Sequence, residues 1–452
     1  MLRSSRMPRA PRSRFSLRPW FEPLEDRFVP ATPGFFQQTN LVADQPAVAA
    51  LHDPEFVGGW GVSISAGGGA VWMSAHGAGV STLYTGDVAG SPVVKNALTV
   101  AIPGGAPTGQ VFNSNASDFT VSAGGGSGRA IFLFATADGD ITGWNPGVPP
   151  PPLSRTAVVG AHTDGAVYTG LAIANTTAGD RLFAADYQNG KIDVFDSSFQ
   201  NVTAAGSFED PRLPRAYHPF NVQALGNELY VTYARRDGDG DHKPDGGTGF
   251  VNVFDRDGNL LRRLASGQHL KGPWGLALAP ADFGPFGGAV LVGNTLNGQI
   301  SAFDPASGKF LGRLDDGRGK PIRIDGLFGL TFGNGVSFGD KNALYFLAGP
   351  DEGEHGLMGS LRFVAQPPGR VEALLNDVIG ALKELLAKLE RHVNVLAAPL
   401  PDAGTPAATG QAVSILFAQA ADSLQELDAP LEATAPAADV FGDLAALLAR
   451  RK

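Results

Sequence analysis

The chain has 452 residues, of which 60 are glycine, 33 are proline and only 17% are charged. This length suits one large repeat domain with additional segments, and this composition favours short strands joined by turns over a helical bundle. The absence of cysteine excludes disulfides, zinc–thiolate sites and thiol catalysis, and the net charge of −9 without a basic, aromatic face argues against a nucleic-acid partner.

Residues 1–32 form a leader that contains seven arginines but not the apolar core of a standard signal peptide. Within it, FEPLEDRFVPA (Phe21–Ala31) resembles the L-E-x-L-E-D-R-x-x-P-A segment at the start of many large bacterial surface and secreted proteins. The resemblance implies export from a bacterium to the cell surface or the extracellular space. The alternative is a disordered basic leader without a sorting role.

One octapeptide pattern recurs along the chain. It reads NGKIDVFD at 189–196, TGFVNVFD at 248–255 and NGQISAFD at 297–304, with weaker copies at 138–145 and 358–365. An apolar stretch that begins with an aromatic or small residue lies upstream of each repeat. The middle positions of these stretches are Gly61, Thr120, Gly170, Asn221, Gly275 and Gly329, with spacings of 59, 50, 51, 54 and 54 residues. The sequence therefore contains six repeat units.

Each unit contains four segments with strand character. The upstream stretch is followed by a second run of aromatic and β-branched residues, a glycine turn, the octapeptide and a more polar fourth run. A single unit cannot bury both of its faces, so the pattern predicts an all-β fold over residues 33–366, a six-bladed β-propeller of four-stranded antiparallel blades. The octapeptide is then the third strand, with Ile192, Val194 and the ring of Phe195 packed between neighbouring blades.

The sixth unit lacks a good fourth strand, because the prolines of QPPGR at 366–370 cannot pair in a sheet. Residues 35–44, FFQQTNLVAD, can supply this strand and close the ring. The alternative is that they form only a lead-in loop.

The last segment, residues 367–452, is predicted to be an α-helical tail interrupted by a Pro/Ala-rich linker. Residues 371–396 place leucines at helical spacing opposite a charged face. The helices either pack on themselves or serve to dock a partner or to form oligomers. No apolar run reaches the roughly 18 residues that a membrane-spanning helix needs, so no membrane span is expected.

Residues 40–87 resemble the first blade of a family of uncharacterised bacterial extracellular propellers. That family reads N-L-V-S-D-x-P-G-V-A-A…D-P-x-L-V-N-P-W-G and ends in S-T-L-Y-x-G, where this chain has NLVADQPAVAA, GGWG and STLYTG. Many members carry a Pro-Glu-Pro sorting signal, which this chain does not show. The resemblance covers residues 36–366 and implies a propeller outside the cytoplasm, with blades similar to the NHL and gluconolactonase-like group and no established activity.

A loop with the sequence RDGDGDHKPDGG at 236–247 has the ligand spacing of a calcium loop, with aspartates at positions 1, 3, 5 and 9. His242 stands where such loops have glycine, and Thr248 stands where they have a bidentate glutamate. The loop is thus either a calcium site or a solvated acidic turn. Its candidate ligands are Asp237, Asp239, Asp241 and Asp245.

A catalytic site in a propeller would lie at the mouth of the central channel, where second strands end and first strands begin. Gluconolactonase-like enzymes hold a divalent metal there with carboxylates and amides, to polarise a carbonyl and activate water. The candidates for this position are Asp118, Asp186, His218, Asn221, Asn294 and Asp325. No strong glutamate ligand accompanies them and no Gly-x-Ser-x-Gly motif is present, so no residue is assigned as catalytic. The aromatic residues at the start of the first strands are expected to be core spacers: Trp60, Phe119, Phe220, Trp274 and Phe328.

The sequence favours an exported, non-enzymatic binding or scaffold propeller at the cell surface, with an unknown surface protein or glycan as partner. The alternative is a metal-dependent lactonase or esterase with its site in the central channel. The enzyme would need a tightly held divalent ion in the channel, whereas the scaffold needs none or only a peripheral calcium.

Overall fold

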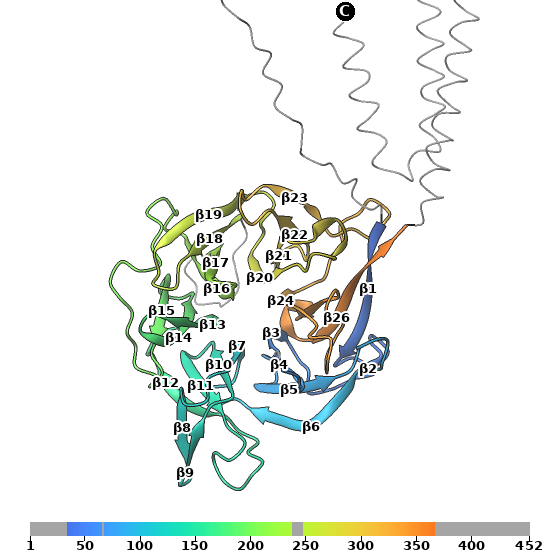
Figure 1. Ribbon diagram of the computed structural model, residues 1–452. Helices are drawn as coiled ribbons and strands as arrows, with labels where there is room; N and C mark the ends of the chain where they lie inside the picture. Colours follow the sequence, from blue (N-terminus) through green and yellow to red (C-terminus); the bar gives the residue numbers. More distant parts are fainter. Residues whose placement is uncertain (1–33, 66, 237–246, 367–452) are drawn as a thin grey trace, which may run out of the picture. The chain divides into compact units, whose positions relative to one another are not determined.

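The computed structural model describes residues 34–65, 67–236 and 247–366, which form the expected six-bladed β-propeller (Figure 1). The predicted leader at 1–32, the predicted helical tail at 367–452 and the four aspartates of the acidic loop lie outside the described residues. Within these ranges, no helix has the length and apolar character needed to cross a membrane.

The first three blades follow the chain from the innermost strand outward. Blade 1 contains β3 (Gly59–Ser63), β4 (Val71–Ala75), β5 (Val80–Thr85) and β6 (Val94–Ala101). Blade 2 contains β7 (Pro107–Phe112), β10 (Phe132–Thr136), β11 (Asp140–Trp144) and β12 (Val158–His162), with a hairpin of β8 (Thr120–Ala123) and β9 (Gly126–Arg129) inserted between its first two strands. Blade 3 contains β13 (Tyr168–Thr176), β14 (Gly179–Asp186) and β15 (Lys191–Phe195).

The other three blades complete the ring. Blade 4 contains β16 (Tyr217–Leu225), β17 (Glu228–Arg235), β18 (Gly249–Phe254) and β19 (Leu260–Gly267). Blade 5 contains β20 (Pro273–Leu278), the 3-10 turn η1 (Gly284–Phe286), β21 (Val290–Asn294), β22 (Ile300–Phe303) and β23 (Phe310–Arg313). Blade 6 contains β24 (Leu327–Phe332), β25 (Leu344–Ala348), η2 (Asp351–Gly353), β26 (Leu357–Ala365) and, from the start of the described chain, β1 (Gly34–Ala43) with the short β2 (Leu51–His52).

The innermost strands lie so close together that they require glycine at one position. Five blades have it there: Gly61, Gly109, Gly170, Gly275 and Gly329. A Cβ atom at Gly61 would lie 2.1 Å from the carbonyl oxygen of Thr108, and one at Gly109 would lie 2.2 Å from the amide nitrogen of Leu171. Real Cβ contacts are much longer, so a side chain at these positions would push neighbouring blades apart.

Blade 2 corrects one sequence expectation. Its inner strand is β7, centred on Gly109, and not the stretch around Thr120, which begins the inserted hairpin. The expectation failed because β7 has Thr108 where four other inner strands have an aromatic residue, whereas Phe119 precedes Thr120 and mimics the pattern. The Thr108 hydroxyl instead donates to the carbonyl of Tyr168 in blade 3, at 2.6 Å.

Blade 3 shows a reduced fourth strand where NVTAAG (201–206) was expected to pair. Asn201 forms one isolated bridge with Phe195, and the Val202 amide donates to the carbonyl of Val194 at 2.8 Å. The Val194 amide then donates to the side-chain hydroxyl of Thr203 at 2.8 Å. The Thr203 hydroxyl thus takes the place of a backbone acceptor, and regular strand pairing ends after the bridge at Asn201.

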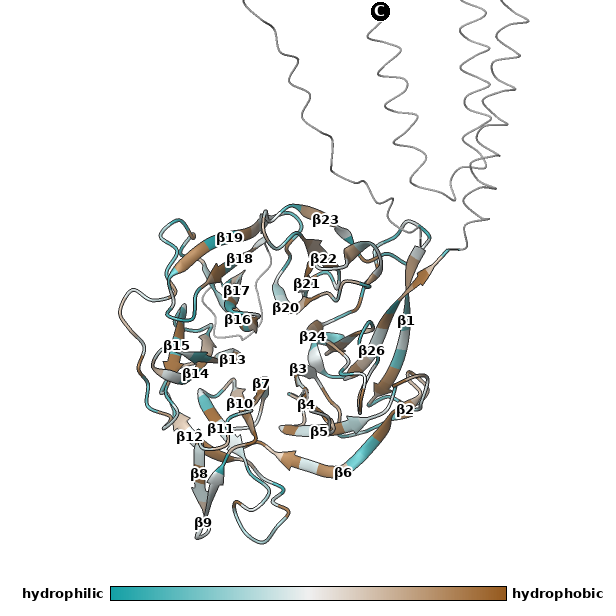
Figure 2. Cartoon of the chain, in the orientation of Figure 1, coloured by the Kyte–Doolittle hydropathy of each residue, from teal (hydrophilic) through white to brown (hydrophobic). Residues whose placement is uncertain are grey.

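The octapeptide packs as expected between neighbouring blades. Ile192 and Val194 belong to the core between blades 3 and 4, and Phe195 faces the core shared with blade 2. The second strands are the most buried: every residue of β4, β10 and β25 is buried. The outer strand β6 carries both hydrophobic and hydrophilic residues (Figure 2), as a half-solvated strand should.

The N-terminal part of the described chain closes the ring, which confirms the prediction for residues 35–44. β1 pairs antiparallel with β26 from Gly34↔Ala365 to Ala43↔Leu357. Just beyond β1, the Asp44 carboxylate accepts hydrogen bonds from the Gly356 amide and from Nδ1 of His355, both at 2.9 Å. These contacts fix the end of the closing strand to the loop that precedes β26.

The His355–Asp44 pair makes closure sensitive to pH. The hydrogen bond to the Asp44 carboxylate raises the pKa of His355 above its ordinary value of 6.5. A raised pKa in the folded state means that the stabilisation is fully present below the unfolded pKa and is lost as the pH rises through the folded pKa. We expect the melting temperature of wild type to exceed that of His355→Gln most at acid pH, with a smaller gap above neutrality. A gap that is constant between about pH 5 and 9 would contradict this assignment.

Candidate functional site at the central channel

Four aromatic side chains from innermost strands converge in the centre of the ring, with two residues at the ends of second strands beside them. The four are Trp60, Phe220, Trp274 and Phe328, and the cluster also contains Tyr187, just after β14, and Ala234 of β17. The rings of Trp60 in blade 1 and Trp274 in blade 5 meet edge to face at 6.3 Å, and those of Phe220 in blade 4 and Phe328 in blade 6 lie 6.5 Å apart. Because these pairs join blades that are not neighbours, the side chains meet across the axis. All are at most 7% exposed.

The core-spacer expectation is therefore confirmed for four of its five residues. Trp60 stacks on Phe328 with ring centroids 4.0 Å apart, and Trp274 packs edge-on against Phe328 at 5.9 Å. Phe119 is the exception, because it lies in the inserted segment of blade 2 and packs against Phe199 between blades 2 and 3.

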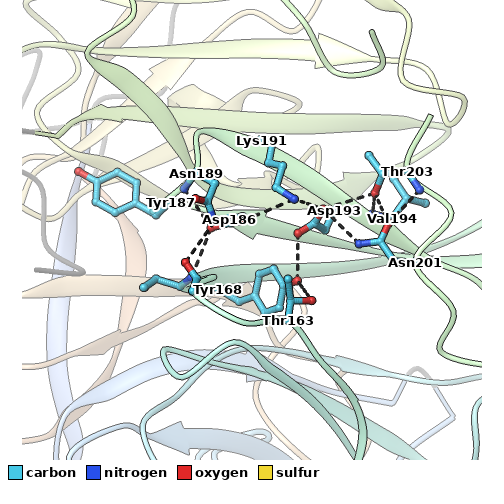
Figure 3. A network of polar contacts seen from close by, with 12 residues as sticks. Thr163, Tyr168, Asp186, Tyr187, Asn189, Lys191, Asp193, Val194, Asn201 and Thr203 are labelled. Carbon is cyan, nitrogen blue, oxygen red and sulfur yellow. Dashed lines mark hydrogen bonds and ion pairs between the residues drawn. The ribbon is translucent and has the colours of Figure 1, made fainter. Parts of the chain in front are cut away.

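Asp186, at the end of β14, is the channel-mouth candidate with the most perturbed environment (Figure 3). Its side chain is fully buried and accepts hydrogen bonds from the amides of Val167 and Asn189, at 3.3 and 3.1 Å, and from the Asn189 side chain at 2.8 Å. Burial raises the pKa of Asp186, although the Asn189 hydrogen bonds oppose this shift. Both carboxylate oxygens are thus engaged by groups that hold the turn between β14 and β15.

A second buried carboxylate, Asp193 in β15, lies beside Asp186 (Figure 3). It accepts hydrogen bonds from the Tyr168 hydroxyl at 3.0 Å and from Lys191 at 2.8 Å, and the Lys191 ammonium lies 4.0 Å from Asp186. Burial raises the pKa of the Tyr168 phenol. The sequence reasoning did not single out Asp193. A signal was present, because the fifth octapeptide position is also polar in two other copies, at Asn252 and Ser301.

Asn294 repeats in blade 5 the role of Asp186 in blade 3. Its side-chain oxygen accepts from the amide of Lys271, in the loop that enters the blade, at 2.7 Å, and its amide donates to the carbonyl of Gln299 at 3.0 Å. Asn221 occupies the inner-strand glycine position of blade 4, and its side chain donates to the carbonyl of Trp274 at 2.8 Å. Both side chains hold backbone segments together.

The last three candidates are held in separate contacts. Nδ1 of His218 donates to the carbonyl of Tyr187 at 2.7 Å, which fixes the ring beside the turn of blade 3. Asp325 accepts from the Asp351 amide at 3.0 Å in blade 6. Asp118 accepts from the Asn115 side chain at 3.0 Å in the loop before β8, so its assignment to an inner strand is wrong.

The centre of the ring is thus packed with aromatic side chains, and the polar candidates around it form hydrogen bonds that hold neighbouring loops in place. Among residues 34–65, 67–236 and 247–366, no three His, Asp or Glu residues are grouped in a way that could hold a metal ion. The calcium ligands proposed from sequence, Asp237 to Asp245, lie outside these ranges. Within the described structure, each candidate side chain is engaged in hydrogen bonds to backbone or side-chain groups of neighbouring segments.

Two relatives are proteins of Acanthamoeba polyphaga mimivirus. "Uncharacterized protein R648" is 33% identical over 332 residues, which cover 71% of this chain and 78% of the relative. "Uncharacterized protein L690" is 31% identical over 361 residues, which cover 76% of this chain and 90% of the relative. The chain belongs to the family of these two proteins. Neither protein's name states an activity, and both relatives are viral, so the resemblance to the bacterial family and the sorting role of the leader stay predictions from the sequence.

Solved structures similar to this family member are distant. The PQQ-bound aldose sugar dehydrogenase of Streptomyces coelicolor matches at a TM-score of 0.42 and 15% identity, covering 74% of this chain and 100% of the enzyme. A gluconolactonase of Xanthomonas campestris matches at 0.27 and 16%, covering 52% and 82%. At these scores and identities the likenesses carry no argument about activity. No family model matches the chain.

Proposed function

We propose that this protein is an exported, non-enzymatic propeller that binds a protein or a glycan at the cell surface. The observation that supports this function best is the closed centre: aromatic rings from blades 1, 4, 5 and 6 occupy the axis where a channel enzyme holds its metal. Substrate could not reach a metal there without displacing rings that are at most 7% exposed.

The alternative function, a metal-dependent hydrolase, is disfavoured because its candidate metal ligands already accept hydrogen bonds from backbone amides. A metal needs carboxylate or amide oxygens with free lone pairs directed at one point. Asp186 and Asn294 instead direct their oxygens at backbone amides of Val167 and Lys271, in two different blades. Their conversion into ligands would leave these partly buried amides without their acceptors, at a cost of about 1 kcal/mol each.

Export is supported by the leader, because Phe21–Ala31 matches a segment common to large bacterial surface proteins. A calcium ion held by Asp237, Asp239, Asp241 and Asp245, as the sequence spacing suggests, is compatible with a scaffold, since such an ion would take no part in a reaction. The helical tail predicted from the sequence at residues 367–452 would provide a further element for docking a partner or joining copies of the chain.

A binding experiment on cells tests this function. Labelled full-length protein is incubated with the cells that produce it, either untreated, treated with protease or treated with periodate. We expect saturable binding to untreated cells that one of the two treatments removes, which identifies a protein or a glycan partner.

Two outcomes would overturn the proposal. The first is the absence of saturable binding to untreated cells. The second is hydrolysis of lactones or esters that depends on added Ca²⁺, Mn²⁺ or Zn²⁺ and is lost in Asp186→Asn. That variant has its own control in His218→Gln, which changes another channel-mouth candidate but not the carboxylate.

A further inference from the structure

A short segment of blade 1 reaches across the junction where the ring closes. Residues 86–91 follow β5 and lie against the loop between β24 and β25 of blade 6. The Gly86 amide donates to the carbonyl of Ser337, and the Gly339 amide donates to the carbonyl of Gly86, both at 2.9 Å. This pairing forms a parallel bridge between Gly86 and Phe338.

Charged groups reinforce this contact. Asp87 is 8% exposed, and its carboxylate accepts hydrogen bonds from the Arg362 guanidinium in β26 and the Tyr345 hydroxyl in β25, each at 2.7 Å. The Asp340 carboxylate of blade 6 accepts from the Ala89 amide at 2.8 Å and from Arg362 at 3.3 Å. Two acids of different blades therefore share one arginine, and removal of Arg362 or of the Tyr345 hydroxyl leaves the buried Asp87 carboxylate without a full set of partners.

The segment also adopts a backbone conformation that is costly for its residues. Asp87 and Ala89 have φ angles of 55° and 49°, in the left-handed region that non-glycine residues avoid. Such strain persists only where surrounding contacts over-determine it, and it concentrates at functional and switching positions. Here hydrogen bonds within residues 87–91 are joined by contacts from blade 6, among them those of Asp340 and Arg362.

The position of the segment gives these contacts their importance. At the other blade junctions the chain runs continuously from the outer part of one blade to the inner strand of the next. The covalent connection of blade 6 to blade 1 runs through β1, which is held to β26 by hydrogen bonds alone, and the register partners Gly34 and Ala365 are separated by nearly the whole described chain. Closure therefore carries an entropic cost that local contacts at this junction must offset.

We propose that residues 86–91, with Asp340, Tyr345 and Arg362, form a clasp that holds the propeller ring closed, and that the ring opens at this junction when the clasp is released. This proposal rests on the fold and is independent of the binding function proposed above. It predicts that loss of the clasp exposes β1 and β26 selectively, before the other blades unfold.

Hydrogen exchange of the full-length protein tests the clasp. The variant is Asp87→Asn, with Tyr345→Phe as a milder change that removes only the hydroxyl. The matched control is Asp193→Asn. Like Asp87, Asp193 is a buried carboxylate that binds a tyrosine hydroxyl and a basic side chain, but its partners Tyr168 and Lys191 belong to its own blade 3. We expect amide exchange in β1 and β26 to become about tenfold faster or more in the clasp variants, relative to β17 and β21, since this corresponds to one lost charge-assisted bond. The control should not show this preference.

An engineered disulfide provides a second readout. The chain has no cysteine, so Phe35→Cys with Val364→Cys introduces one pair, at partly exposed positions that face each other in the β1–β26 register. Under oxidising conditions this bond should restore slow exchange at β26 in Asp87→Asn, and reduction should reverse the effect. Uniform acceleration of exchange in all blades of Asp87→Asn, or an equal preference for β1 and β26 in Asp193→Asn, would overturn the proposal.

Discussion

Gly109→Ala should destabilise the propeller severely, by about 3 kcal/mol or more, at the upper end of the range for overpacked cores. The added methyl group would lie 2.2 Å from the amide nitrogen of Leu171 and 2.6 Å from the carbonyl carbon of Gly170, both backbone atoms of the next inner strand. A side chain could rotate away from such a clash, but backbone atoms of an inner strand can move only if the blades separate. Chemical denaturation of wild type and variant measures the change in unfolding free energy.

The control for this prediction is Gly67→Ala. Gly67 lies in the loop between β3 and β4, and its nearest neighbour would be the Ser65 hydroxyl at 3.9 Å, an ordinary contact. We expect that variant to stay within about 0.5 kcal/mol of wild type, as surface substitutions do. Similar losses in both variants would show that the inner strands are not in the tight contact described.

Trp274→Ala should cost about 3–5 kcal/mol, because it removes the largest class of side chain from a closed core and leaves a cavity. Trp274 packs against Trp60 and Phe328, and its indole nitrogen donates to the carbonyl of Thr169 at 2.9 Å. The rings on the axis support one another, so the loss affects four blades at once. The unfolding free energy and the near-ultraviolet circular dichroism of the aromatic residues report it.

Trp274→Phe separates packing from hydrogen bonding in this cluster. The phenyl ring retains most of the aromatic contact but leaves the Thr169 carbonyl without its donor, which should cost about 1–3 kcal/mol. A Trp274→Ala loss no greater than that of Trp274→Phe would mean that the centre collapses around the cavity. An unchanged stability in both variants would contradict the closed centre, on which the proposed function depends.

The repeat made the architecture readable from the amino-acid sequence. Six apolar first-strand stretches and five copies of the octapeptide indicate a propeller, because each blade has two apolar faces and only another blade can cover them. The sequence also pointed to the closing strand, since prolines after Ala365 excluded a local fourth strand and residues 35–44 were available to supply it, and the pairing of β1 with β26 confirms this. The repeat and the missing fourth strand can both be recognised from the order of residues along the chain, without knowledge of any long-range contact.

The tertiary structure alone decided the inner strand of blade 2 and the meaning of the polar candidates. Phe119 was assigned to an inner strand and Gly109 was overlooked, because a motif compares only residues that are close along the chain. The inner position is instead determined by contact with the backbone of the next blade. Asp186 and Asn294 fall at the expected strand ends, yet whether such oxygens face a metal or a backbone amide depends on the loop that enters from the preceding blade. Periodicity determines which residues lie on one face of a strand, but hydrogen-bond partners from distant segments determine what those residues can do.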